Sequence, residues 1–445
     1  QDPDDWWRGL CSSVREAIAG VDPEEVASVA LSGQLNGAVF VDAKGCPQRM
    51  VPIWLDHRSQ KECDWAQDRA GDLLRDRALT RLGPVNTLAK VLWVKANEPE
   101  VYRQSRWALL PKDWLRFRLS GQIGAEISDA SVTAAFDLDA REWCSDILDA
   151  LEIDAGLFPK LSESSEVVGA ITKEAAAETG LAVDTPIVAG GGDMPCMILG
   201  SGVIEPGIVG LGIGTAAHAT ACAEHLDPRA FNTLWPMCHP IPGQYAWLGC
   251  SFTGGASLKW FKDELGGSYE ELTRAAAGVP AGAEGLFFMP WLEGRATPGP
   301  DADARGGFVG LSLRHTKGHM VRAVMEGVGF DLRHSLDCFV ELGLPVDELR
   351  IGEGGSHSEL WRQIQADILG RDVVRIETDD LSAVGAALLA GVGVGVYADF
   401  DTACRRAVKL AECVYCDQVT VDEYRRVFDR YAALYPALKG WYAGR

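Results

Sequence analysis

The sequence has no long run of strongly apolar residues and no cysteine spacing typical of a disulfide framework. Its most evenly apolar stretch, residues 381–398, is rich in glycine and alanine rather than leucine and isoleucine. We therefore expect a close-packed buried helix there and no membrane span. The 12 cysteines lack framework spacing, and the N-terminal residues QDPDDWWRGL do not resemble a signal peptide. These absences predict reduced thiols and a cytoplasmic protein.

Basic residues are also far fewer than acidic residues. The chain has 42 lysines and arginines against 63 aspartates and glutamates, which gives a formal net charge of -21. Such a surface argues against nucleic acid and against an anionic membrane as partners. It does not exclude a phosphorylated small molecule, because a local pocket can be positive inside an acidic protein. Cys413 and Cys416 form a solitary C-x-x-C pair, from which we expect no metal site.

The length of 445 residues allows two or three domains with an ample core. The hydrophobic content of 47% and the charged content of 24% are ordinary for a globular protein. Strand–turn–helix units recur in two halves, residues 1–205 and 206–445, and each half has glycine turns able to face a shared cleft. We therefore expect an α/β architecture of two lobes.

One stretch, residues 186–220, carries the strongest chemical signal. An apolar strand at 187–189 leads into three glycines and a single carboxylate, Asp193. A second apolar strand at 208–213 ends in Gly214 and Thr215, whose N–H groups and hydroxyl can hold an anion. In open α/β sheets, ligands bind at such strand ends. A further strand at 349–352 leads to another glycine turn.

Each of these features also has a plain structural interpretation, which stays open at this point. Asp193 could cap the helix that follows it, and the two later glycine turns could serve only chain reversal or packing. Asn36 could be a turn residue in a hairpin whose strands are 26–31 and 38–42. Asp56, after an expected strand at 51–55, could be a cap or a partner of Arg58.

Taken together, six segments resemble the FGGY carbohydrate kinases, and within them the xylulokinase group most closely, over nearly all of the chain. They are SGQLNG at 32–37, similar to SGQMHG; WLDHRS at 54–59, similar to WNDxR; LLPKDWLRFRLSG at 109–121, similar to LLPKDYLRxxLTG; GGGDM at 190–194, similar to GGGDN; GIGTA at 212–216, similar to SLGTSG; and EGGSHSELWRQ at 353–363, similar to GGGARSxxWRQ. Long collinear matches of this kind are far more specific than any single glycine motif.

The resemblance implies an actin/hexokinase-like (ribonuclease H-like) ATPase fold of two lobes with a central cleft. It implies an N-terminal sugar-binding lobe at 1–205, a C-terminal nucleotide-binding lobe at 206–445, and ATP and Mg²⁺ as cofactors. The reaction would transfer the γ-phosphoryl group of ATP to a sugar hydroxyl, with no partner beyond small molecules except a possible homodimer.

The resemblance also implies roles for individual residues. Asp193 would act as the general base that accepts the proton of the attacking hydroxyl. The residues expected at the sugar are Gln34, Leu35, Asn36, Asp56 and Met194. The residues expected at the nucleotide and its phosphates are Gly214, Thr215, Gly354, Gly355 and Ser358. No protein ligand set for a metal is expected, because Mg²⁺ would bridge phosphate oxygens mostly through water.

The chain departs from the family pattern in places. The family's first phosphate loop, a DxGTxxxK hairpin, is absent from these 445 residues, so we expect an N-terminal lobe without its central strands and a chain that alone is unstable and inactive. Asn36 stands where the xylulokinase group has His, Met194 where it has Asn, and Ala216–Ala217 where it has Ser-Gly. WLEGRATP at 291–298 also departs from YLSGERTP.

The leading expectation for function is phosphorylation of D-xylulose to D-xylulose 5-phosphate. One alternative is a kinase of the same family for another ketose or polyol, such as ribulose, gluconate or a glycerol-like substrate. A second alternative, from a different class, is a catalytically inactive protein that binds a sugar or a nucleotide. A DxGT hairpin encoded before Gln1 would favour the enzyme.

Overall fold

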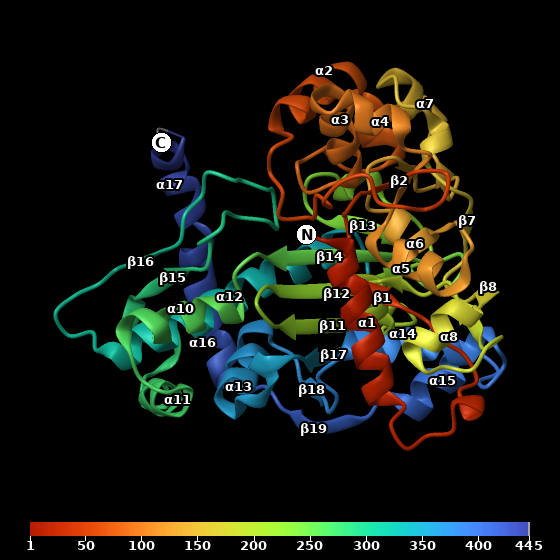
Figure 1. Cartoon of the computed structure of the whole chain (residues 1–445). Helices are drawn as coiled ribbons and strands as arrows, with labels where there is room; N and C mark the ends of the chain where they lie inside the picture. The colour runs from red at the N-terminus through yellow and green to blue at the C-terminus, as the bar shows by residue number, and fades with distance from the viewer. Residues whose placement is uncertain (444–445) are drawn as a thin grey trace.

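A broad central sheet forms the frame of the C-terminal half (Figure 1). The computed structural model describes residues 1–443, and within them this sheet has seven strands in the order β13–β14–β12–β11–β17–β18–β19. The strands are β11 (Gly207–Ile213), β12 (Ala217–Ala223), β13 (Trp235–Cys238), β14 (Tyr245–Ser251), β17 (Val346–Gly352), β18 (Val373–Ile376) and β19 (Leu410–Val414). A separate pair is formed by β15 (Phe287–Met289) and β16 (Gly307–Val309).

The centre of this sheet brings two strand ends together. Strand β11 runs parallel to β17, with Gly212 opposite Gly352, and antiparallel to β12, with Gly212 opposite His218. Because β11 and β17 are parallel, their carboxyl ends lie at the same edge of the sheet. The turn after β11 and the turn after β17 are therefore neighbours, at the edge of the sheet where ligands bind in open α/β sheets.

Helices cover the sheet and supply most of the core. The long helix α12 (Lys317–Glu341) contacts β12, β14 and β17 and is buried over most of its length. The remaining helices of this half are α10 (Gly255–Leu265), α11 (Tyr269–Ala277), α13 (Glu359–Leu369), α14 (Leu381–Gly393), α15 (Phe400–Ala407), α16 (Gln418–Ala432) and α17 (Leu434–Tyr442).

Short strands and helices make up residues 1–200, most of which lie in the upper and right-hand parts of Figure 1, while α1 runs down its centre. Within the described residues these strands pair only two by two: β1 (Ser32–Gly33) with β10 (Gly191–Gly192), β2 (Val39–Val41) with β3 (Trp107–Leu109), β4 (Ala125–Glu126) with β7 (Leu161–Ser162), β5 (Phe136–Asp137) with β6 (Glu142–Trp143), and β8 (Val167–Ala170) with β9 (Pro186–Val188). The helices are α1 (Pro3–Ala17), α2 (Gln60–Arg77), α3 (Thr87–Asn97), α4 (Pro99–Gln104), α5 (Pro111–Ser120), α6 (Ile127–Ala130), α7 (Ser145–Ala150), α8 (Lys173–Thr179) and α9 (Asp193–Gly200).

The expected hairpin of residues 26–42 is wrong. Strand β2 pairs with β3, while the segment before it pairs with the region just before Asp193, through the Val29–Ile187 bridge and through β1 and β10. Residues 51–55 contain no strand either. Apolar patterning identified buried segments here but not their partners, because those partners lie far away in the chain.

A tight helix pair joins the two halves. Helix α9 packs against α14 at such short range that a Cβ on Gly385 would lie 1.8 Å from the Cys196 carbonyl oxygen, and one on Gly200 would lie 1.9 Å from that of Leu381. This confirms the predicted close-packed helix of small residues. Among residues 1–443, no helix combines the length and the apolar character needed to cross a bilayer.

Candidate active site

The turn that carries Asp193 is shaped by glycine. Gly190 has φ of 79°, and a Cβ there would lie 2.1 Å from the carbonyl oxygen of Leu31, so only glycine fits. The next two residues form β10, which pairs in parallel with Ser32–Gly33. This pairing sets the loop at 32–37 directly beside Asp193, the first residue of α9.

The Asp193 carboxylate is accessible yet only partly hydrated. Its Oδ1 accepts a hydrogen bond of 2.7 Å from the Met194 N–H, and the residue is exposed. Protein atoms crowd around it nevertheless, and this partial desolvation raises its pKa to about 6. A reachable carboxylate with a raised pKa suits a group that accepts a proton near neutral pH.

The loop at 32–37 offers polar groups next to that carboxylate. Leu35 packs against the turn, since a Cβ on Gly192 would lie 2.2 Å from Leu35 Cδ2. Asn36 has φ of 64°, a conformation that asparagine tolerates, and its buried Oδ1 accepts no hydrogen bond within the described residues. Gln34 Nε2 donates to Gln1 Oε1 at 3.0 Å. Asn36 therefore combines a turn conformation with a side-chain oxygen that accepts no hydrogen bond from the described residues.

Asp56 is held by Arg58 in a two-pronged ion pair. The guanidinium Nε lies 2.9 Å from Oδ1 and Nη2 lies 2.5 Å from Oδ2, which holds the pKa of Asp56 below its usual value. Arg58 in turn lies over the Trp93 ring, 4.3 Å from its centroid. Asp56 and Gln1 both line a hollow of about 470 Å³. Asp193 is not among the residues that line this hollow, and a role for Asp56 at the sugar stays a prediction.

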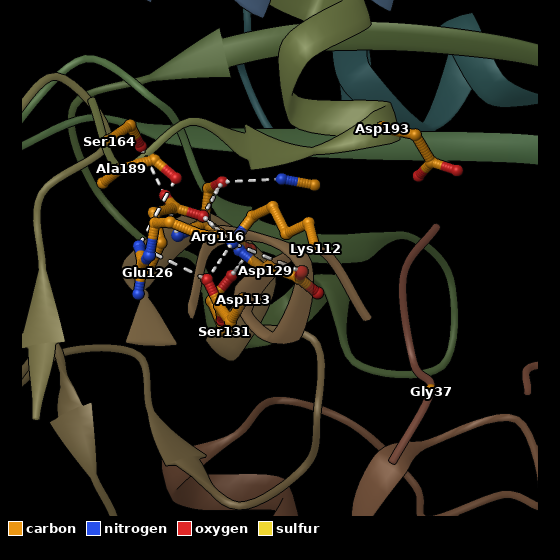
Figure 2. Close-up of polar contacts among 12 residues, drawn as sticks. Gly37, Lys112, Asp113, Arg116, Glu126, Asp129, Ser131, Ser164, Ala189 and Asp193 are labelled. Atoms are coloured by element: carbon orange, nitrogen blue, oxygen red, sulfur yellow. Dashed lines mark hydrogen bonds and ion pairs between the residues drawn. The ribbon is translucent and has the colours of Figure 1, made fainter. Parts of the chain in front are cut away.

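A buried ionic cluster lies beneath the Asp193 turn (Figure 2). Its members are Lys112, Asp113, Arg116, Glu126 and Asp129, all almost inaccessible to solvent. The Lys112 Nζ lies 2.8 Å from an oxygen of Asp113, 3.4 Å from one of Glu126 and 3.6 Å from one of Asp129. In Figure 2 the Asp193 carboxylate points away from this cluster, toward the segment that carries Gly37.

Charge balance in the cluster depends on Asp129. Two cationic and three acidic side chains share this interior, and neither Asp129 carboxylate oxygen accepts a hydrogen bond from the described residues. Burial, opposed by Lys112 and reinforced by the neighbouring carboxylates, raises the pKa of Asp129 well above its usual value. For Lys112, burial alone would lower the pKa, but the three carboxylates outweigh it and raise it. A protonated Asp129 leaves two charges of each sign.

The cluster and its neighbours hold the Asp193 turn by its backbone. Ser128, whose hydroxyl donates to Glu126 at 2.9 Å, accepts from the Gly192 N–H at 3.4 Å. The Gly190 N–H donates to the Ser164 carbonyl at 3.0 Å, and the Ser164 hydroxyl donates to Glu126.

Arg116 completes this support by donating to the Ala189 carbonyl oxygen at 3.4 Å. Sequence reasoning missed these supporting residues. The available signal was the Lys-Asp pair set among apolar residues in the segment 109–121.

The turn after β11 is held through its carbonyl groups by the residues at the start of α10 (Gly255–Leu265). The Gly255 N–H donates to the Gly214 carbonyl at 2.7 Å, and the Gly254 N–H donates to the Thr215 carbonyl at 2.9 Å. In a trans peptide the C=O and the next N–H point in opposite directions, so the N–H groups of Thr215 and Ala216 point away from α10. Thr215 is exposed. The role of this turn in holding phosphate groups stays a prediction.

The turn after β17 lies against this one. A Cβ on Gly355 would lie 2.6 Å from Ile213 Cβ, whereas Gly354 has open space around its Cα. Ser358 Oγ accepts from the Trp361 N–H at 3.3 Å and so caps α13. The structure thus brings Gly214, Thr215, Gly354 and Gly355 together. The Ser358 side chain has a structural role, because it caps the N-terminus of α13. A role for Ser358 at the nucleotide stays a prediction.

Comparison with known proteins agrees with this geometry. Residues 1–200 match the N-terminal domain of the FGGY family of carbohydrate kinases, and residues 221–394 match its C-terminal domain. The chain is 32% identical to a xylulose kinase of Bacillus subtilis over 443 residues, covering 99% of this chain and 89% of that one. It is 29% identical to a glycerol kinase of Citrifermentans bemidjiense over 411 residues, covering 89% and 82%.

Solved structures agree on the architecture. The crystal structure of a xylulose kinase from Rhodospirillum rubrum superposes with a TM-score of 0.91 at 28% identity, covering 100% of this chain and 91% of that one. The expected two-lobed α/β kinase fold is confirmed, and so is an enzyme that phosphorylates a sugar with ATP. The chain belongs to the FGGY family of carbohydrate kinases.

Proposed function

We propose that this kinase phosphorylates D-xylulose at its 5-hydroxyl and that Asp193 is the general base. The observation that carries the proposal is the pairing of β1 with β10, which sets the loop at 32–37 beside an accessible carboxylate. The pKa of about 6 at Asp193 means that it is ionised at neutral pH and still basic enough to take a proton. Similarity to xylulose kinases supports the choice of sugar.

In the proposed reaction the sugar O–H proton moves to an Asp193 carboxylate oxygen. The freed oxygen forms a bond to the γ-phosphorus of ATP, and the bond from that phosphorus to the β–γ bridging oxygen breaks, which releases ADP. Such catalysis consists mainly of positioning and electrostatic stabilisation. The buried cluster beneath the turn contributes the positioning, because it fixes the backbone that carries Asp193.

The remaining site residues divide between the two substrates. Gln34, the unused Asn36 acceptor and Asp56 suit sugar hydroxyls, while Leu35 and Met194 form apolar walls. The N–H groups of the Gly214–Thr215 turn suit the β- and γ-phosphates, and the open backbone at Gly354 and Gly355 suits the nucleoside. Mg²⁺, when bound, would neutralise phosphate charge. A cytoplasmic location and a homodimer stay predictions.

A different ketose or polyol is the second candidate. Asn36 and Met194 depart from the xylulokinase pattern next to the expected sugar position, and one relative of similar identity is a glycerol kinase.

The test is a coupled assay of ADP release with D-xylulose, D-ribulose, gluconate and glycerol, using the protein encoded by the complete gene. D-Xylulose should give the highest kcat/KM. Asp193→Ala should lower kcat by about 10²–10⁴-fold, the usual contribution of a positioned base, while the exposed Asp149→Ala should leave it unchanged. Undiminished turnover in Asp193→Ala would refute the base, and preference for another sugar would replace D-xylulose.

A further inference from the structure

Glu353 lies at the carboxyl end of β17, beside the proposed phosphate turn. Its backbone has φ of 64° and ψ of -177°, a region that is essentially restricted to glycine. It stands where the FGGY pattern GGGARS has its first glycine. The chain therefore keeps a charged residue in a backbone conformation that disfavours any side chain, next to a site where phosphates are expected.

The Glu353 carboxylate lies over bare backbone. A Cβ on Gly212 would be only 2.5 Å from Glu353 Oε2, and one on Gly214 would be 2.9 Å from the same oxygen. Two glycines thus open the space that the carboxylate fills. The Glu353 side chain is about one-quarter exposed, at 27%.

One oxygen of this carboxylate lacks a partner. Glu353 Oε2 is buried and accepts no hydrogen bond from the described residues. The nearest cationic candidate is His218, with Nδ1 at 3.9 Å, but burial lowers the pKa of His218, so the ring is neutral at pH 7. A buried carboxylate oxygen without a donor or a countercharge is costly, and a bound ligand that supplies a cation would relieve it.

The neighbouring groups decide which cation fits. Within residues 1–443 no group of three or more acidic, histidine or cysteine side chains is arranged to hold a metal, so Glu353 alone has too few ligands. Mg²⁺ in nucleotide sites is typically held by one or two carboxylates together with substrate phosphates. The amide donors of Thr215 and Ala216 lie in the adjacent turn, where those phosphates are expected.

We propose that Glu353 binds the Mg²⁺ that accompanies the nucleotide phosphates, directly or through one water, and thereby makes nucleotide binding metal-dependent. The proposal rests on the nucleotide site of the proposed function. Without Mg²⁺ the carboxylate repels the phosphates at the Gly214–Thr215 turn. With Mg²⁺ the same carboxylate attracts the complex, so one residue selects the metal-bound nucleotide against the free one.

The test is calorimetric titration with ADP of the protein encoded by the complete gene, in excess Mg²⁺ and in EDTA, which needs no turnover. The variants are Glu353→Gln, which removes the charge and keeps the backbone conformation, and Glu353→Gly, which restores the family residue. The control is Glu359→Gln, an exposed carboxylate in the first turn of α13. Pyrophosphate with and without Mg²⁺ serves as a second probe that lacks the nucleoside.

In the unaltered chain, Mg²⁺ should tighten ADP binding strongly. Both Glu353 variants should lose about tenfold or more of that Mg²⁺ enhancement, as expected for one lost charge contact near a protein surface. They should bind free ADP as tightly as the unaltered chain or more tightly. Glu359→Gln should keep the full enhancement, and Mg-pyrophosphate should follow the same pattern.

Two results would overturn the inference while leaving the nucleotide site intact: an unchanged Mg²⁺ enhancement in the Glu353 variants, or an equal loss of affinity in Mg²⁺ and in EDTA. The second result would assign Glu353 to a nucleoside hydroxyl instead. If ADP fails to bind the unaltered chain under either condition, the proposed nucleotide site falls and this inference falls with it.

Discussion

The glycine turn before Asp193 and the glycine corner formed by residues 212–214 and 353–355 both lie at strand ends, yet they differ in how their polar groups are satisfied. Beneath the first, Lys112 has carboxylate oxygens at 2.8, 3.4 and 3.6 Å, and the turn's backbone is bonded to neighbouring side chains. At the second, Glu353 has a glycine-like φ of 64° and a buried oxygen that accepts no hydrogen bond from residues 1–443.

This difference matches two different tasks. A general base must keep its position through the reaction, so its turn benefits from a buried network that fixes the backbone. A corner that binds a charged ligand can keep a buried polar atom without a hydrogen bond in the free protein, because the ligand supplies the missing partner when it binds. Strain and unpaired polar atoms concentrate at functional sites for this reason.

The largest expected effect comes from breaking the network under Asp193. Lys112→Met should destabilise the protein by about 3–5 kcal/mol, since removal of one partner leaves buried charge uncompensated. Urea unfolding measures it. Lys44→Met, at an exposed position, should change stability by less than about 0.5 kcal/mol. Equal unfolding free energies for the two variants would mean that the cluster does not hold the turn.

The next effect concerns the Asp193 pKa of about 6. As a base Asp193 must be ionised, so kcat/KM should fall about tenfold per pH unit below about pH 6. The free energy of unfolding should change in the opposite direction to kcat/KM, falling as the pH rises. The pKa in the unfolded chain is about 3.9, so between about pH 4 and pH 6 the folded form binds more protons and loses stability as pH rises.

Asp193→Asn separates these two consequences. The variant should be more stable than the unaltered chain at pH 7, where the charged carboxylate is partly desolvated, and should lose that advantage at about pH 4. Urea unfolding at both pH values measures it. A stability difference that is the same at the two pH values would show that Asp193 has an ordinary pKa, and the contrast between a tuned base and its well-paired surroundings would then disappear.

Local features of this fold could be predicted from the sequence, and distant pairings could not. The strands that precede Gly190 and Gly214 and the small-residue helix at 381–393 follow from apolar runs and glycine position. The pairing of Ser32–Gly33 with Gly191–Gly192 does not, because it joins segments far apart in the chain. Periodicity indicates that a strand is buried but not which strand lies beside it.

The candidate site divides in the same way. Asp193 and Gly214–Thr215 stand out because a carboxylate or a hydroxyl follows glycine at a strand end. Lys112 and Asp129 do not stand out in the sequence, because the buried ionic cluster exists only once α5 and α6 are packed together. Glu353 does not stand out in the sequence either, because a residue letter does not reveal a backbone φ of 64°. The family resemblance identified the fold, while the structure identified the support and the strain.

The smallest expected effect tests that strain directly. Glu353→Gly should stabilise the protein by about 1–3 kcal/mol, the usual cost of a non-glycine residue in this region of φ and ψ. Glu353→Gln should gain less, because it removes the charge and keeps the backbone conformation. Urea unfolding of both variants in EDTA, without nucleotide, measures the difference. If the glutamine variant gains as much as the glycine variant, the cost at this corner is electrostatic rather than conformational. The corner would then differ from the Asp193 turn only in its unpaired charge.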